Sequence, residues 1–260
     1  MAKKNTLTGE QKFNNYYLGL YSKRWDGLRS ALLQEKESSI SIPDLESPYY
    51  LDKASFDTAN LLPVEKGMSV LDMCAAPGGK SLVLAKKLLG DGLLISNDRS
   101  PERRERLRKV INDCLSEEER EIIKITGYDA SSWGVYEKEI YDAILLDAPC
   151  SSERHVLNSK EHLAIWSESR PKRLSILQYA MLSSALLAAK HGGYILYSTC
   201  SINDKENQDI IAKLVKKHSE EIEFIQIDIP GSEKLTYGNI VLPDRAEGRG
   251  QMYACLMRKI

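Results

Sequence analysis

The sequence predicts a doubly wound α/β fold, in which helices cover both faces of a mostly parallel sheet. From residue 69 onward, short apolar segments alternate with longer segments of helical periodicity. The segment from Tyr141 to Asp147 is almost continuously apolar, as expected of a central parallel strand that is buried on both faces. Small residues and glycines also follow the first strand, at the point where the chain turns into a helix.

Length and composition indicate a globular chain with one main domain. The 260 residues exceed the usual domain size of about 100 to 150 residues, but one large α/β unit reaches this length. Hydrophobic residues make up 42% and charged residues 28%, which excludes a disordered, collagen-like or disulfide-framework protein. Lysine and arginine (36) nearly balance aspartate and glutamate (37), so any surface that binds nucleic acid has to be local.

The sequence does not predict a membrane segment or an export signal. Its longest apolar runs fall far short of the roughly 20 residues that cross a bilayer. Two lysines near the start are not followed by an apolar segment, which argues against a secretory signal. We therefore expect a cytoplasmic protein without membrane contact, or a mitochondrial one if a transit segment has been removed.

The individual elements are expected at defined places along the chain. We expect strands at 69–73, 93–97, 141–147 and 194–198, and a final hairpin formed by 223–227 and 251–257. We expect helices at 81–89, 101–112, 172–190 and 203–218. Ser100 and Pro101 predict a helix start, and His191-Gly-Gly is expected to end the third helix. Capping-box spacing at Ser116 leaves a short helix or turn and a strand both open for residues 116–125.

The N-terminal part of the chain has a different character. Residues 13–32 form an aromatic-rich amphipathic stretch, and serine and proline punctuate residues 38–48. We expect an N-terminal helix whose aromatic face packs on the main domain. The predicted division is a helical extension over residues 1–60 and a main domain over residues 61–260.

The turn after the first strand has the composition of a ligand-binding turn. It consists of Cys74, Ala75, Ala76, Pro77, Gly78, Gly79 and Lys80. In open α/β sheets, ligands bind outside the carboxyl ends of the strands, and the N–H groups at a helix start favour a carboxylate. A nucleotide-like or amino-acid-bearing cofactor therefore fits this turn. The spacing matches neither a P-loop nor the usual dinucleotide-binding pattern.

Three aspartates follow successive strands of the same sheet. Asp98 ends the second strand, about 20 residues after the turn, where a carboxylate can accept both hydroxyls of a ribose. Asp129 follows the third strand and is placed to meet an adenine amino group, while Asp147 ends the fourth. One aspartate at a strand end often only caps a turn, but three beside one glycine turn favour a ligand site.

The five cysteines form an odd set without a C-x-x-C pair, so reduced thiols are expected. Cys150 and Cys200 follow strand ends, where the sulfur is open to a ligand and where a neighbouring cation such as Lys80 lowers a thiol pKa from about 8.5. We expect nucleophilic catalysis from these two. Cys74, Cys114 and Cys255 are expected to be small buried apolar residues.

Four motifs, in this order, resemble the Nop/Sun family of RNA cytosine-5 methyltransferases. They are Leu71–Lys80, Asp98–Arg103, Asp147–Cys150 and Ser198–Ser201. The resemblance extends from about residue 48 to the end and is strongest to the ribosomal-RNA subgroup that includes the mitochondrial member. It implies a Rossmann-like, seven-stranded class I methyltransferase sheet and S-adenosylmethionine as cofactor.

The resemblance also implies roles for the matching positions in the cofactor site. The turn from Cys74 to Lys80 would hold the methionine end of S-adenosylmethionine. Asp98 would bind the ribose, with Arg103 as a neighbouring contact, and Asp129 would bind the adenine.

The implied catalytic residues follow the fourth and fifth strands. Cys200 corresponds to the family's nucleophile, which bonds to carbon 6 of cytosine, and Cys150 to the second cysteine, which assists release of the product. Asp147 and Lys80 would lie at the reaction centre, where Asp147 also borders the cofactor.

RNA, and ribosomal RNA in particular, is the expected partner of a monomeric enzyme, with a ribosomal or accessory protein as a further candidate. Basic side chains gather in two segments: Arg99, Arg103, Arg104, Arg106, Arg108 and Lys109, and then Arg154, His155, Lys160, Arg170, Lys172 and Arg173. No metal is predicted, because His155 has no second ligand at metal-binding spacing. Three alternatives stay open: a transfer-RNA methyltransferase, a DNA cytosine-5 methyltransferase that uses Cys150, and a non-catalytic ribosome-assembly factor.

Overall fold

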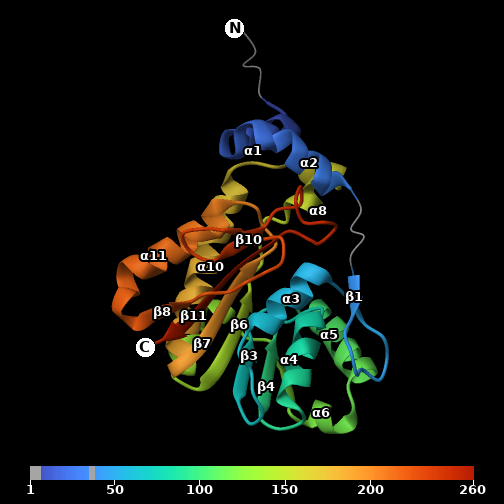
Figure 1. Cartoon of the computed structure of the whole chain (residues 1–260), viewed down its shortest axis with the longest axis vertical. Helices are drawn as coiled ribbons and strands as arrows, with labels where there is room; N and C mark the ends of the chain where they lie inside the picture. The colour runs from blue at the N-terminus through green and yellow to red at the C-terminus, as the bar shows by residue number, and fades with distance from the viewer. Residues whose placement is uncertain (1–6, 35–38) are drawn as a thin grey trace.

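The computed structural model describes residues 7–34 and 39–260. Residues 1–6, on which the predicted lack of a secretory signal depends, and Ser38 lie outside the described residues. A central sheet runs through the molecule, with helices on both of its faces (Figure 1). In the described part of the chain, no helix is both long and apolar enough to span a membrane.

Nine strands in the described residues form one sheet in the order β5-β4-β3-β6-β7-β11-β10-β9, with β8 also paired to β11. The strands β3 to β7 are parallel, and β11 runs antiparallel to β7. The doubly wound α/β prediction is therefore confirmed. Their bounds are β3 Ser69–Asp72, β4 Leu93–Asn97, β5 Ile123–Thr126, β6 Tyr141–Asp147, β7 Ala189–Thr199, β8 Ile222–Ile225, β9 Glu233–Lys234, β10 Asn239–Val241 and β11 Met252–Lys259.

The far edge of the sheet holds two strands more than the seven predicted. One edge of the long strand β11 pairs with β8 along residues 256–259 and with β10 along residues 252–254. The expected pairing of 223–227 with 251–257 is therefore present, but the two segments do not form a consecutive hairpin. The short strands β9 and β10 lie between them in sequence, and they lack the length and alternation that identify a strand.

Helices α3, α4 and α5 cover one face of the sheet, and α7, α10 and α11 cover the other. Strand β6 contributes to both cores, because Ala143 and Leu145 pack with the first group while Ile144 and Leu146 pack with the second. This two-sided burial explains the apolar run in the sequence. The helix bounds are α3 Lys53–Leu61, α4 Gly79–Leu88, α5 Pro101–Cys114, α6 Glu117–Glu121, α7 Trp133–Tyr136, α10 Ser169–Ala188 and α11 Gln208–His218.

Local signals placed the start of α5 correctly, whereas α4 and α10 begin two and three residues earlier than predicted, and α11 begins at Gln208, after a 3-10 turn at Asp204–Glu206, instead of at residue 203. Ser100 caps α5 through its side chain, with Pro101 as the first helical residue. Ser116 and Glu119 form a capping box, and the uncertain segment 116–125 contains both the short helix α6 and the strand β5.

The expected end of the third long helix is wrong. Helix α10 ends at Ala188, and His191-Gly-Gly lies inside β7. The register between β6 and β7 shifts at this point, since Tyr141 pairs with Ala189 but Ala143 pairs with Tyr194. A bulge thus absorbs the glycines, and Gly192 adopts φ +83°.

The N-terminal aromatic stretch forms two helices instead of the single predicted one. The helices are α1 Gly9–Tyr21 and α2 Trp25–Leu33, joined by a 3-10 turn at Ser22–Arg24. Phe13, Tyr17 and Trp25 are buried; Phe13 and Tyr17 pack against Trp166, and Trp25 packs against Phe13, which confirms the predicted core contact. In Figure 1 these helices lie at one end of the molecule, where α2 contacts α8 (Glu153–Leu157) and α1 contacts α9 (Lys160–Ala164). The division of the chain at residue 60 stays a prediction.

Candidate active site

The turn that follows β3 has no room for side chains at its two glycines. Gly78 adopts φ +125°, and a Cβ there would lie 3.0 Å from Val110 Cγ1. A Cβ on Gly79 would lie 2.8 Å from Leu51 Cδ1. At position 78 the positive φ favours glycine, and at position 79 a side chain would displace the ends of the Leu51 and Tyr49 side chains. The turn leads directly into α4, whose N-terminus carries partial positive charge and favours a carboxylate ligand.

Two small cavities lie on either side of Cys74, at the carboxyl ends of the parallel strands. One has a volume of about 50 Å³ and is lined by Leu51, Asp72, Cys74, Ala75, Ala76, Pro77, Gly79, Lys80 and Asp147. The other, of about 140 Å³, is lined by Met73, Cys74, Asn97, Asp98, Arg99, Arg103, Tyr128, Asp129, Ala130, Pro149, Leu177 and Met181. Of the residues predicted for the cofactor, only Gly78 lines neither cavity.

Asp98 is buried beside the larger cavity, where Arg103 and the backbone of Ser100 hold its carboxylate. Its Oδ1 accepts a hydrogen bond from the backbone N–H of Ser100. Its Oδ2 lies 3.0 Å from Arg103 Nη1, but among the described residues it has no hydrogen-bond donor in good geometry. A buried acceptor that faces a cavity fits a hydroxyl-bearing ligand. Arg103 also donates to the carbonyl of Ala76, and so links the aspartate to the glycine turn.

Asp129 lies at the outer rim of the larger cavity. Its Oδ1 accepts hydrogen bonds from the backbone and hydroxyl of Ser131, which lower the pKa of Asp129. Asn97 was missed in the sequence analysis, although it joins the end of β4 to the loops after β3 and β5. Its amide donates to the carbonyls of Met73 and Tyr128, and its oxygen accepts from Tyr128 N–H.

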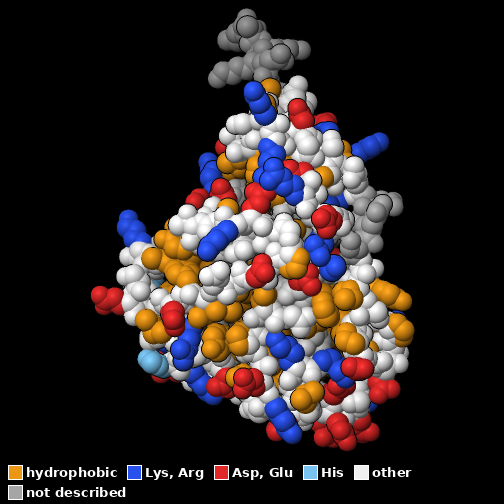
Figure 2. All heavy atoms as spheres, in the orientation of Figure 1, with side chains coloured by type: hydrophobic (Ala, Val, Ile, Leu, Met, Phe, Trp, Pro, Cys, Tyr) orange, Lys and Arg blue, Asp and Glu red, His pale blue; other side chains and the backbone are white. Residues whose placement is uncertain are grey.

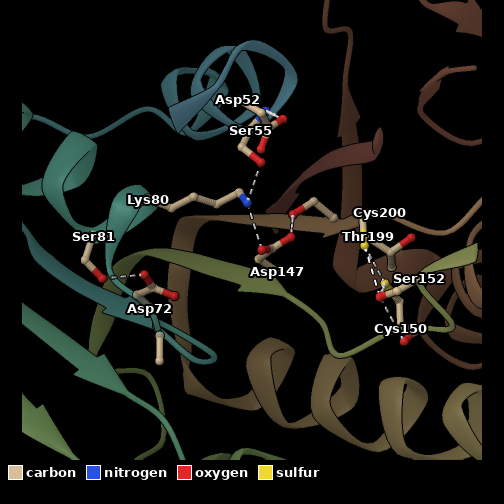
Figure 3. Close-up of polar contacts among 12 residues, drawn as sticks. Asp52, Ser55, Asp72, Lys80, Ser81, Asp147, Cys150, Ser152, Thr199 and Cys200 are labelled. Carbon is tan, nitrogen blue, oxygen red and sulfur yellow. Dashed lines mark hydrogen bonds and ion pairs between the residues drawn. The ribbon is translucent and has the colours of Figure 1, made fainter. Parts of the chain in front are cut away.

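Lys80 and Asp147 form a shielded ion pair between the cofactor turn and β6 (Figure 3). Lys80 Nζ lies 2.8 Å from Asp147 Oδ2 and 3.1 Å from Ser55 Oγ. The other oxygen of Asp147 accepts from Ser198 Oγ at 2.9 Å. Burial opposes the charge on Lys80, but the neighbouring Asp147 outweighs burial and raises the pKa of Lys80. Ser55 and Ser198 are further site residues that the sequence did not reveal.

Asp72 lies beneath this pair at the end of β3. It is fully buried, and Ser81 donates a hydrogen bond to its Oδ2 at 2.8 Å. Burial raises the pKa of Asp72 to about 7, an effect that the bond from Ser81 only partly opposes. The aspartate in the first motif is therefore a second acidic group that borders the small cavity.

The two predicted catalytic cysteines lie side by side. Cys150 follows β6 and Cys200 follows β7, and their sulfur atoms are 3.0 Å apart. The hydroxyl of Ser152 lies 3.5 Å from Cys150 Sγ and 3.4 Å from Cys200 Sγ. Both cysteines are partly exposed, and Figure 3 places them beside the Lys80–Asp147 pair.

The two thiols differ in acidity because of the hydrogen bond between them. Donation from Cys150 lowers the pKa of Cys200, and a contact from Ser152 acts in the same direction against the effect of burial. The same bond, together with burial, raises the pKa of Cys150 well above its ordinary value. The hydrogen bond between the two sulfur atoms thus favours the thiolate at Cys200 over that at Cys150.

The remaining cysteines show no such activation. Cys114 and Cys255 are buried, and burial raises the pKa of each, which confirms that they are apolar core residues. Burial also raises the pKa of Cys74, although this residue is partly exposed and lines both cavities.

Comparison with known proteins identifies the family. Residues 59–257 match the family model of the 16S rRNA methyltransferase RsmB/F. The chain belongs to the RsmB/F family. The Nop/Sun resemblance of the four motifs is thereby confirmed, since the curated relatives of the chain are RNA cytosine-5 methyltransferases of this kind.

Three RsmB/F relatives illustrate the range of the family. The chain is 34% identical over 232 residues to the 5-cytosine rRNA methyltransferase NSUN4 of Bos taurus, covering 80% of this chain and 59% of that protein. It is 31% identical to the mitochondrial tRNA (cytosine(34)-C(5))-methyltransferase of Mus musculus, covering 83% and 64%. It is 36% identical to ribosomal RNA small subunit methyltransferase F of Shewanella loihica, covering 66% and 35%. The chain thus spans one to two thirds of the length of these relatives.

Solved structures share the fold of this RsmB/F chain. A methyltransferase homologue from Pyrococcus horikoshii superposes with a TM-score of 0.75 at 20% identity, covering 95% of this chain and 94% of the other. NSun6 from Pyrococcus horikoshii, solved with SFG, superposes with a TM-score of 0.68 at 24% identity, covering 82% and 53%. The sheet is that of the class I S-adenosylmethionine-dependent methyltransferases.

Proposed function

We propose that this chain is an S-adenosylmethionine-dependent RNA cytosine-5 methyltransferase that acts on ribosomal RNA through a covalent bond between Cys200 and carbon 6 of the base. One observation carries the proposal. Two thiols of unequal acidity lie 3.0 Å apart at the ends of adjacent parallel strands, beside the Lys80–Asp147 pair and the cavities around Cys74. Neither cofactor binding alone nor structural use of cysteine requires this arrangement.

The residues around Cys74 fit the proposed cofactor. Asp98 offers a buried carboxylate oxygen to a ribose, and Asp129 lies beyond it for the adenine. The glycine turn and the start of α4 suit the carboxylate of the methionine part. When bound, S-adenosylmethionine supplies an electrophilic methyl group.

Cys200 overcomes the low reactivity of the base. Carbon 5 of cytosine is too weak a nucleophile to take a methyl group directly. Addition of the Cys200 thiolate to carbon 6 makes carbon 5 enamine-like and able to attack an electrophile. The hydrogen bond from Cys150 favours this thiolate before the base arrives.

Asp147 and Lys80 stabilise the charge that develops on the base. As the ring accepts electrons from the sulfur, negative charge develops at its N3 edge; a proton relayed from the Lys80 ammonium through the Asp147 carboxylate neutralises it and returns when Cys200 is expelled. Lys80 and Ser198 hold that carboxylate from both sides, so little reorganisation is needed during the reaction.

Product release requires removal of the proton on carbon 5. Its loss restores the double bond between carbons 5 and 6 and expels Cys200 as a thiolate. Cys150, whose sulfur lies 3.0 Å from that of Cys200, directs this step, either as base once Cys200 is bonded to carbon 6 and no longer shares its hydrogen bond, or through an oriented water.

Recognition of RNA requires a local basic surface. On the face drawn in Figure 2, basic and acidic side chains are interspersed, in line with the net charge of −1. On α5, Arg106 and Arg108 pair with glutamates of the same helix. Arg154 is used internally, because it donates to carbonyls at the end of α2. In the predicted basic segment next to Cys150, the side chains of Lys160, Lys172 and Arg173 are left to contact phosphates.

The rival nucleophile is Cys150, as in a DNA cytosine-5 methyltransferase. The thiol acidities favour Cys200, since Cys150 holds its proton more tightly. Among the RNA substrates, the rRNA relatives and the family description favour ribosomal over transfer RNA. The assembly-factor alternative does not account for the paired thiols. The cytoplasmic location and the monomeric state stay predictions.

The decisive experiment measures methyl transfer from labelled S-adenosylmethionine to unmodified small-subunit ribosomal RNA, with transfer RNA and duplex DNA in parallel. We expect Cys200→Ala to lose more than about a thousandfold in rate, because no other group activates the base. Cys150→Ala should instead accumulate a protein–RNA adduct on denaturing gels. Equal incorporation by wild type and Cys200→Ala would exclude the mechanism, and loss of all adduct in Cys150→Ala alone would favour the rival.

A further inference from the structure

A polar cluster is buried behind the two cysteines, and the proposed mechanism leaves it unused. It consists of Glu153, Gln178, Ser201 and Glu206, each with no exposed surface. Carboxylates are rarely buried so completely unless they are paired or hydrogen-bonded. We call this group the carboxylate cluster.

Glu206 contacts the loops of both cysteines. Its Oε2 accepts from the backbone N–H of Ser151 at 2.8 Å, next to Cys150. Its Oε1 lies 3.3 Å from the hydroxyl of Ser201, next to Cys200. Gln178 connects the same carboxylate to the first loop a second time, since its amide donates to Glu206 and to the carbonyl of Pro149.

Glu153 completes the link from the other side of Ser201. Its Oε1 accepts from the Ser201 hydroxyl at 2.8 Å and from the hydroxyl of Tyr17 at 2.6 Å. Its Oε2 accepts from the backbone N–H of Ile202. The cluster therefore joins the two cysteine loops to each other and to helix α1.

The loop that carries Cys150 needs such anchors. Ser152, whose hydroxyl touches both sulfur atoms, adopts φ +52°, a conformation that side chains other than glycine rarely take. Residues with that backbone persist where the surroundings determine them. Here Pro149 and Ser151 accept from or donate to members of the carboxylate cluster, and Glu153 belongs to it.

We propose that Glu206 is a positioning residue for the reaction: through Ser151 and Ser201 it fixes the two cysteine loops so that the thiol of Cys150 reaches the sulfur of Cys200. The functional meaning of this placement rests on the proposed activity, but the placement itself does not. Glu206 touches neither sulfur, and it acts through the backbone and the serine that it holds.

The protonation of the cluster suggests a matched control. Burial and the neighbouring Glu153 raise the pKa of Glu206 to about 7, and burial raises the pKa of Glu153 as well. The groups that face Glu206 are Tyr17 from α1, Glu153 from α8, Gln178 from α10 and Tyr197 from β7. An amide at position 206 resembles the protonated acid, accepts from Ser151 and Gln178, and donates to Ser201. Glu206→Gln should therefore preserve the placement, whereas Glu206→Ala removes it.

The test measures how fast diamide, a two-electron thiol oxidant, joins Cys150 to Cys200 in the folded 260-residue chain, with mass spectrometry of the linked peptides. We expect Glu206→Ala to slow this disulfide by roughly tenfold, since the buried donors of Ser151, Gln178 and Ser201 each lose an acceptor. Glu206→Gln should match wild type. Ser184→Ala controls for general destabilisation. Ser184 is buried on α10, the helix that carries Gln178, but its hydroxyl accepts from the backbone of Gly134 and not from the cluster.

The same variants are then assayed for RNA methylation, where Glu206→Ala should lower kcat with little change in KM for S-adenosylmethionine. Equal disulfide rates in wild type and Glu206→Ala would overturn the inference, as would a loss of rate in Ser184→Ala of the same size. If Glu206→Ala does not fold, Ser201→Ala serves, since it removes the shared hydroxyl and leaves both carboxylates. Should wild type methylate no RNA while the disulfide rates follow expectation, the proposed activity fails and the positioning role stands.

Discussion

The two halves of the site are built in different ways. The cofactor half consists of the turn from Cys74 to Lys80 with Asp98 and Asp129, and its shape follows from a few contiguous residues and strand ends. The thiol half consists of Cys150 and Cys200, and its shape depends on side chains from α1, α10 and two loops. Backbone geometry therefore dominates one half, and long-range side-chain bonds dominate the other.

Among variants that leave both thiols in place, the largest expected effect falls on the residue that connects the halves. Asp147→Asn keeps the size of the side chain but loses the charge that pairs with Lys80. We expect kcat to fall by about a hundredfold, a loss typical of removing one preorganised electrostatic contact. Cofactor binding, measured by calorimetry, should change much less. A parallel loss of cofactor affinity would mean that the two halves are not separable at Asp147.

A second prediction concerns the pH dependence of stability, which should come mainly from buried acids. Glu206 has an ordinary pKa of 4.5 that burial raises to about 7, so the folded state binds a proton more tightly than the unfolded state. Its stabilising contribution is present below the unfolded value and is lost as the pH rises through about 7, by at most about 3 kcal/mol. Urea unfolding should show wild type losing stability between about pH 5 and about pH 8.

Glu206→Gln is the matched variant for this second prediction, because an amide does not titrate. The decline should become shallower but should not vanish, since burial also raises the pKa of Asp72 to about 7. Identical pH profiles for wild type and Glu206→Gln would show that the thiol half does not carry this acid in the folded state.

The smallest expected effect tests the backbone logic of the cofactor half. Gly79→Ala places a methyl group 2.8 Å from Leu51 Cδ1, so the turn or its neighbours must shift. We expect cofactor affinity to fall by roughly tenfold, the size of a moderate packing strain. The diamide rate for Cys150 and Cys200 should stay unchanged. Gly19→Ala is the control, because a Cβ at Gly19 meets no neighbour and the backbone there has no positive φ. Gly90→Ala is unsuitable, because Gly90 has φ +73°.

Individual elements show where the sequence predicted the structure and where it did not. The strand over Tyr141 to Asp147 was predicted with its bounds, because burial on both faces leaves an uninterrupted apolar run. The predicted end of α10 was wrong, because the glycines after it form a bulge in β7 that depends on pairing with β6. The split of the N-terminal helix at Ser22 likewise depends on how α1 and α2 pack on α8 and α9.

The sequence alone determined the chemical inventory of this protein: the glycine turn, the strand-end acids and the two thiols, all of which lie in short contiguous motifs. Their convergence at one edge also followed, because parallel strands bring their carboxyl ends together. Only the tertiary structure decided which thiol is acidic and what holds the pair in place. Ser152, Gln178, Glu153 and Glu206 are ordinary polar residues in the sequence, and their role arises from hydrogen bonds between segments far apart in the chain, which no local pattern encodes.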